Sequence, residues 1–78
     1  MISATMQNAL NAQINAEQYS AQLYLAMSAH CDARSFKGFG SWLRVQASEE
    51  TLHAAKLIDF LLDRGGRLEL KPIPAPPT

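Results

Sequence analysis

Glu17, Glu50 and His53 are the residues of this sequence whose types and spacing best suit metal chemistry. The segment from about Ala4 to Cys31 contains neither Gly nor Pro. Apart from a histidine near its end, Glu17 is its only acidic or basic residue. It stands three residues after Ile14, inside an apolar helical stripe. A carboxylate in such a stripe loses much of its hydration unless a positive group meets it. Because the segment has no Lys or Arg, a metal cation is a natural counter-charge.

The second half of the chain repeats this anomaly with a Glu-x-x-His pair. Glu50 stands seven residues after Leu43 and seven before Leu57, so it falls in the apolar stripe of a second helix. His53 follows one helical turn later on the same face. The second helix therefore places a carboxylate and an imidazole side by side on its apolar face.

A short turn near residues 32–35 would bring the two helices together as antiparallel neighbours. Glu17, Glu50 and His53 are nearly equidistant from that turn, so we expect them in one layer. Two carboxylates and an imidazole suit iron, with manganese and zinc as alternatives. Carboxylate di-iron bundles use one Glu from each of two helices and a Glu-x-x-His from each of the other two, and a two-fold dimer of this chain would supply that set. The simpler alternative is a His–Glu hydrogen bond within the second helix, with the first-helix carboxylate facing solvent.

The elements that position these residues are two helices of roughly equal length. The first is predicted from about Ala4 to Cys31, with Ser3 as N-cap and Thr5 as the alternative. The apolar stripes of the two helices define the expected core. The stripe of the first helix consists of Leu10, Ile14, Ala21, Tyr24 and Met27. The stripe of the second consists of Leu43, Ala47, Ala54, Leu57 and Leu61, with Phe60 beside them.

The sequence offers two possible starts for the second helix. Ser35 could cap a helix that begins at Phe36, but two glycines soon afterwards each cost roughly 1 kcal/mol relative to Ala and allow a start as late as Ser41. The helix should end at Arg64, because the pair Gly65-Gly66 supplies a left-handed stop.

The predicted fold class is all-α: an antiparallel two-helix hairpin over residues 1–71 and a Pro-rich extended tail over residues 72–78. One hairpin cannot bury both apolar stripes against itself, so we expect it to be half of a four-helix bundle. Another copy of the chain or a missing second half would complete the bundle, and self-association is the expected partnership. A charge-poor polar surface on the first helix also suits a subunit contact; it consists of Gln7, Asn8, Asn11, Gln13, Asn15, Gln18 and Gln22.

Composition excludes several other functions. The formal net charge is zero, which argues against nucleic acid as the main partner. No stretch of about 20 apolar residues is present, so no membrane span is expected. The N-terminus lacks the basic residues and apolar run of a secretory signal, and the single cysteine, Cys31, makes no internal disulfide. We therefore expect a cytoplasmic protein.

Three runs of the sequence resemble the non-haem bacterial ferritins: Ala16–Met27, Phe39–Ala54 and Leu61–Ile73. The resemblance covers essentially the whole chain, but only the first half of a ferritin subunit. It implies a ferritin-like fold whose Pro-rich tail is the start of the long crossover between helix pairs. It also implies iron storage and detoxification, through oxidation of Fe(II) to Fe(III) at a di-iron ferroxidase centre.

The resemblance assigns a role to each matching residue. It implies that Glu17 and His53 bind one iron and that Glu50 bridges two. It places Tyr24 beside the centre as a redox-active or hydrogen-bonding phenol, and it points Glu49 toward an accessory third iron.

The residues between Glu50 and His53 are Thr51 and Leu52 rather than the haem-binding Met of bacterioferritins, so no haem is expected. Three functional hypotheses remain open: a ferroxidase whose site a second helix pair completes, a non-catalytic helical dimerisation module or ferritin fragment with an incomplete site, and a di-iron peroxide reductase.

Overall fold

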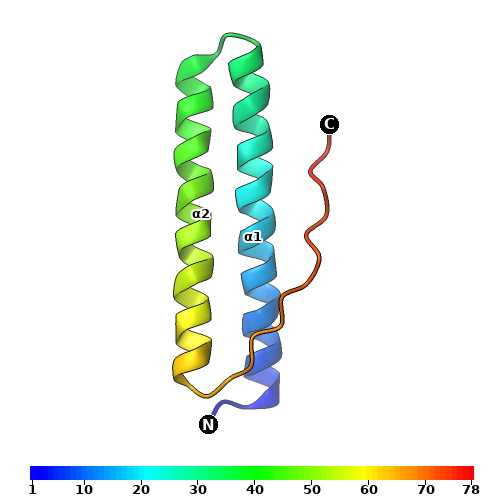
Figure 1. The fold of residues 1–78 in the computed structure, drawn as a ribbon, viewed down its shortest axis with the longest axis vertical. Coiled ribbons are helices and arrows are strands. Elements are labelled where there is room, and N and C mark those ends of the chain that lie inside the picture. Colours follow the sequence, from blue (N-terminus) through cyan, green and yellow to red (C-terminus); the bar gives the residue numbers. More distant parts are fainter.

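A computed structural model describes all 78 residues as an antiparallel helical hairpin followed by an extended segment (Figure 1). Helix α1 spans Ala4–Ala33 and helix α2 spans Lys37–Asp63, with no strands. The molecule is elongated, measuring 50 × 20 × 12 Å. Neither helix has a stretch that is both apolar and long enough to cross a membrane. The predicted all-α hairpin is therefore confirmed.

The two helices begin in different ways. Ser3 caps α1 as predicted, because its Oγ accepts a hydrogen bond of 3.1 Å from the Met6 amide. The prediction that Ser35 caps α2 is wrong: its φ is 66°, in the left-handed region, and its amide donates back to Asp32. Ser35 thus terminates α1, since an N-cap needs an extended backbone. Phe36 precedes α2 without any side-chain capping hydrogen bond.

Helix α2 runs through both of its early glycines, so the alternative start at Ser41 is also wrong. Ser28 of α1 donates a hydrogen bond of 2.6 Å to the Gly40 carbonyl. A Cβ on Gly40 would collide with the Asp32 carboxylate, so the glycine permits the close approach of the two helices. At the other end, Gly65 adopts a φ of 72° and ends α2 as predicted.

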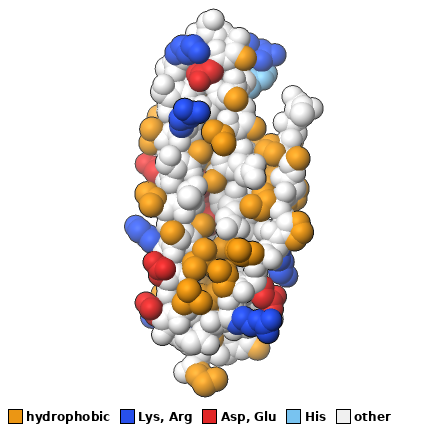
Figure 2. Space-filling model, in the orientation of Figure 1, with side chains coloured by type: hydrophobic (Ala, Val, Ile, Leu, Met, Phe, Trp, Pro, Cys, Tyr) orange, Lys and Arg blue, Asp and Glu red, His pale blue; other side chains and the backbone are white.

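The core between the helices is small and lies mainly on α2. Only five apolar residues are buried: Ile14, Leu43, Ala47, Ala54 and Leu61. The predicted stripe of α2 is therefore largely confirmed, whereas Ile14 is the only predicted core residue of α1 that is buried. Met27 and Phe60 keep 43% and 40% of their surface exposed, because one helix covers only part of each stripe. Figure 2 shows hydrophobic side chains gathered on the visible face over the lower half of the helices.

The C-terminal segment, residues 67–78, lies alongside α1 (Figure 1). Asn11, which is only 3% exposed, donates to the Arg67 carbonyl at 2.9 Å and accepts from the Glu69 amide at 2.8 Å. Gln7 accepts from the Arg67 amide at 2.8 Å, and Asn15 donates to the carbonyls of residues 71 and 72 at 3.4 Å. These three amides therefore bind the chain's own backbone, and a subunit contact through the polar surface of α1 stays a prediction.

Candidate metal centre

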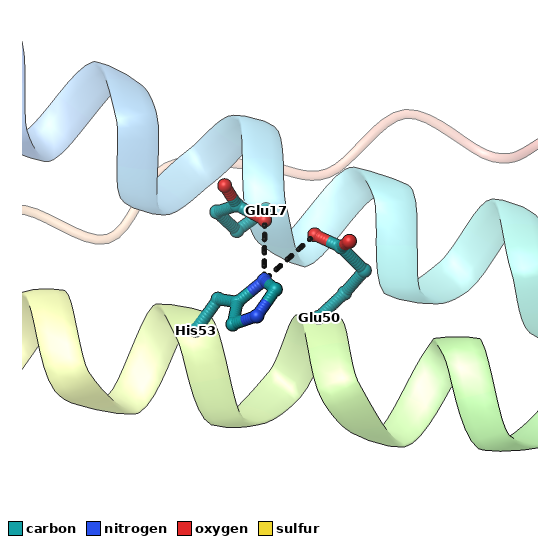
Figure 3. Close-up of side chains that lie close together, drawn as sticks. All are labelled: Glu17, Glu50 and His53. Atoms are coloured by element: carbon teal, nitrogen blue, oxygen red, sulfur yellow. Dashed lines mark ion pairs between the residues drawn. The ribbon is translucent and has the colours of Figure 1, made fainter.

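Glu17, Glu50 and His53 lie together at mid-height of the hairpin (Figure 3). Helix α1 supplies Glu17, and α2 supplies Glu50 and His53 one turn apart. The Nδ1 atom of His53 is 3.7 Å from the Glu17 Oε2 atom and 3.6 Å from the Glu50 Oε2 atom. One potential ligand atom from each residue lies within 4.8 Å of the others. The antiparallel register thus joins residues that are far apart in the sequence.

The three side chains are covered to different extents. Those of Glu17 and Glu50 are 18% and 19% exposed, whereas that of His53 is 52% exposed. The carboxylates therefore sit in the groove between the helices, and the imidazole lies at its open edge. All three side chains keep part of their surface exposed to solvent, and His53 keeps the most.

The two carboxylates of this group have little positive charge nearby, and their proximity shifts the pKa of both. The proximity of Glu17, through a hydrogen bond and charge repulsion with a contribution from burial, raises the pKa of Glu50. The hydrogen bond from Glu50, followed by one from Gln13, lowers the pKa of Glu17. As the pH falls, Glu50 is therefore protonated before Glu17. Their only ion-pair partner is His53, so a bound cation would relieve their repulsion.

A fourth side chain, which was not among the predicted site residues, contacts this group. Gln13 Nε2 donates a hydrogen bond of 2.9 Å to Glu17 Oε1. Gln13 precedes Glu17 by one helical turn, a spacing that brings side chains together on a helix surface. This i, i+4 spacing was the available signal for a Gln–Glu contact.

Two further residues assigned by resemblance lie outside the three-residue group. Tyr24 is half-buried on α1, two turns beyond Glu17, and Glu49 is exposed on α2. Their roles as a neighbouring phenol and an accessory iron ligand stay predictions.

The donor set fits a hard or borderline divalent cation. Two carboxylates and one imidazole are ligands typical of iron, manganese and zinc. All three come from rigid helices rather than loops, which fixes their separation. The side of the group that faces away from the hairpin receives no ligand from this chain, so the set is open to further ligands.

Comparisons with known proteins agree on one family. The model of the ferritin-like domain matches residues 7–78. Over 78 residues the chain is 45% identical to a bacterial non-heme ferritin of Staphylococcus haemolyticus and 42% identical to one of Bacteroides fragilis, covering all of this chain but 47% and 49% of theirs. The chain therefore spans about half the length of the curated relatives it matches.

Solved structures give the same result. The chain is similar to an open-pore ferritin of Archaeoglobus fulgidus, with a TM-score of 0.95 and 53% identity over 97% of this chain and 46% of that one. It matches an engineered closed form of the same ferritin with a TM-score of 0.96 and 52% identity over 99% of this chain and 47% of that one. The hairpin thus corresponds to half of a four-helix bundle.

Proposed function

The chain belongs to the ferritin family, and we propose that it binds Fe(II) and promotes its oxidation to Fe(III) for storage. The observation that carries this proposal is the convergence of Glu17, Glu50 and His53 from two helices with no Lys or Arg to neutralise them. Family membership indicates which of the chemically suitable metals to expect, and a cytoplasmic location remains part of the prediction.

The residues of this chain have distinct parts in the proposed reaction. Two Fe(II) ions each lose one electron, and the pair of electrons reduces O₂ to peroxide or peroxide to water. Glu17 and His53 would hold one iron, and Glu50 would lie between two. Carboxylate oxygens favour the harder Fe(III) product while allowing it to exchange, which suits transfer to a store. Tyr24 and Glu49 would act at the edge of the centre.

We infer that a second helix pair supplies the remaining ligands. Trp42 and Phe60 fall on the same face of α2 as His53, at spacings of eleven and seven residues. They are 57% and 40% exposed, so large apolar side chains on either side of His53 along α2 are left for a second pair to cover. That pair belongs either to another copy of this chain or to a further part of a longer one. Light scattering together with intact mass separates these two cases.

Single substitutions test the proposed chemistry. We expect Glu50→Ala and His53→Ala to abolish rapid Fe(II) oxidation, followed through ferric absorbance, while helicity measured by circular dichroism is retained. Asp59→Asn, an exposed acid elsewhere on α2, is the matched control and should oxidise Fe(II) normally. Unchanged oxidation in both site variants would refute the proposal.

Anaerobic Fe(II) titration separates catalysis from a purely structural role. Stoichiometric binding that is lost in Glu50→Ala supports the ferroxidase function. A hairpin that associates but binds no iron would instead be a dimerisation module, in which the polar group only fixes the register of the helices. Comparing O₂ with peroxide as oxidant then distinguishes iron storage from peroxide reduction.

A further inference from the structure

The two oxygens of the Glu17 carboxylate have different surroundings. Oε1 accepts the 2.9 Å hydrogen bond from Gln13 Nε2. Oε2 lies 3.7 Å from His53 Nδ1, on the side where Glu50 also approaches. One oxygen is therefore tied to a neighbour on the same helix, while the other faces the remaining members of the group.

We propose that Gln13 is a positioning residue of this centre, which holds Glu17 Oε1 so that Oε2 alone is offered to the metal. This inference rests on the proposed function and adds to it the way in which Glu17 binds. A carboxylate with both oxygens free can rotate and chelate a cation through both. The amide removes that freedom, so the side chain enters the complex already oriented and with one oxygen as ligand.

The chemistry of the amide matters as much as its place. A Gln side chain donates a hydrogen bond without carrying charge. A Lys or Arg at the same position would also orient the carboxylate, but its positive charge would repel the cation and compete for Glu17. A neutral donor therefore orients Glu17 and preserves the negative charge that attracts metal.

The position of Gln13 makes the idea testable without disturbing the fold. Its side chain is exposed, and its one side-chain hydrogen bond is the one to Glu17. Replacement should thus leave the packing of α1 against α2 intact. Gln22 is a matched control, because it is an exposed glutamine on the same helix that makes no side-chain hydrogen bond within the chain.

Cobalt(II) is a suitable probe, since its visible absorption reports the number and geometry of its ligands. Cobalt(II) is titrated in the same buffer into the native chain and into three variants, Gln13→Leu, Gln13→Lys and Gln22→Leu. We expect Gln13→Leu to weaken binding about tenfold, as loss of a group that orients a ligand typically does, and to change the shape and intensity of the visible bands. Gln13→Lys should bind more weakly still, most clearly at low salt, and Gln22→Leu should match the native chain.

The outcomes separate this inference from the function on which it rests. If the native chain binds cobalt(II) and loses it in Glu17→Ala, but Gln13→Leu has the native affinity and spectrum, the positioning role is wrong and the metal centre stands. If Gln13→Lys binds as tightly as the native chain, the argument for a neutral donor is wrong. If the native chain binds no cobalt(II), the metal centre fails and the inference fails with it.

Discussion

Replacing Asn11 with alanine tests how firmly the C-terminal segment is tied to α1. Asn11 is 3% exposed and makes three hydrogen bonds through its side chain. Two of them reach across 56 and 58 residues of sequence, to the Arg67 carbonyl and from the Glu69 amide. The third goes to the Gln7 carbonyl in the preceding turn at 3.2 Å. No other side chain in the molecule makes two short bonds to the C-terminal segment.

The size of the effect follows from these bonds. Each of the two long-range bonds contributes about 1 kcal/mol net to the free energy of unfolding. Alanine recovers roughly 0.5 kcal/mol through its higher helix propensity, but the lost packing of a buried side chain offsets that gain. We therefore expect Asn11→Ala to lower the free energy of unfolding by about 2 kcal/mol. For a chain of this length that corresponds to a fall in Tm of about 10 °C.

Urea and thermal unfolding of both proteins, at one protein concentration, measure this loss. Asn15→Ala is the control, because its bonds to the same segment are both 3.4 Å long, and we expect it to cost under about 0.5 kcal/mol. Hydrogen exchange gives a local readout: the Glu69 amide should lose its protection in Asn11→Ala. Equal stability losses in the two variants, or an unchanged Glu69 amide, would refute the argument.

Four other substitutions probe the helix contact and the site. Gly40→Ala should destabilise the hairpin, because its Cβ would collide with α1, whereas Gly38→Ala meets nothing within 4 Å and should stabilise it by about 0.5–1 kcal/mol; thermal unfolding of the pair gives both signs. Ser28→Ala removes a buried bond of 2.6 Å and should cost about 1 kcal/mol in urea unfolding. Glu50→Gln should leave metal-free stability unchanged near pH 4 but raise it toward pH 7. The reason is that Glu17 raises the pKa of Glu50, so the native fold loses stability as pH rises through that pKa; equal pH profiles for the two proteins would contradict this.

The sequence predicted those parts of the fold and site that depend on residues spaced at the helical period. The apolar stripe of α2 predicted four of the five buried apolar residues, and equal distance from the turn predicted that Glu17 would meet Glu50 and His53. Both inferences use only the geometry of an antiparallel helix pair. The stop at Gly65 was equally accessible, because its left-handed backbone is the ordinary property of a glycine at that place.

Other features depend on tertiary contacts that leave no periodic signal. Ser35 takes a left-handed backbone that its residue type does not favour, and Gly40 lies within α2 where Ser28 donates to its carbonyl and Asp32 occupies the space of a Cβ. The bonds from Asn11 to the C-terminal segment join residues at opposite ends of the sequence. Gln13 could have been paired with Glu17 from their spacing, but a glutamine on a polar helix surface has many equivalent interpretations.

The side-chain amides of α1 bind the C-terminal segment only through its main chain. This limits which residue types the hydrogen bonds exclude from the segment. Only the N–H groups of Arg67 and Glu69 donate to α1, so the hydrogen bonds exclude proline at those two positions. Pro72, the first proline of the segment, contributes a carbonyl, which proline retains. The hydrogen bonds to α1 therefore restrict the residue type only at positions 67 and 69, and any further restriction on the segment falls on its half-buried side chains, Leu68, Ile73 and Pro76.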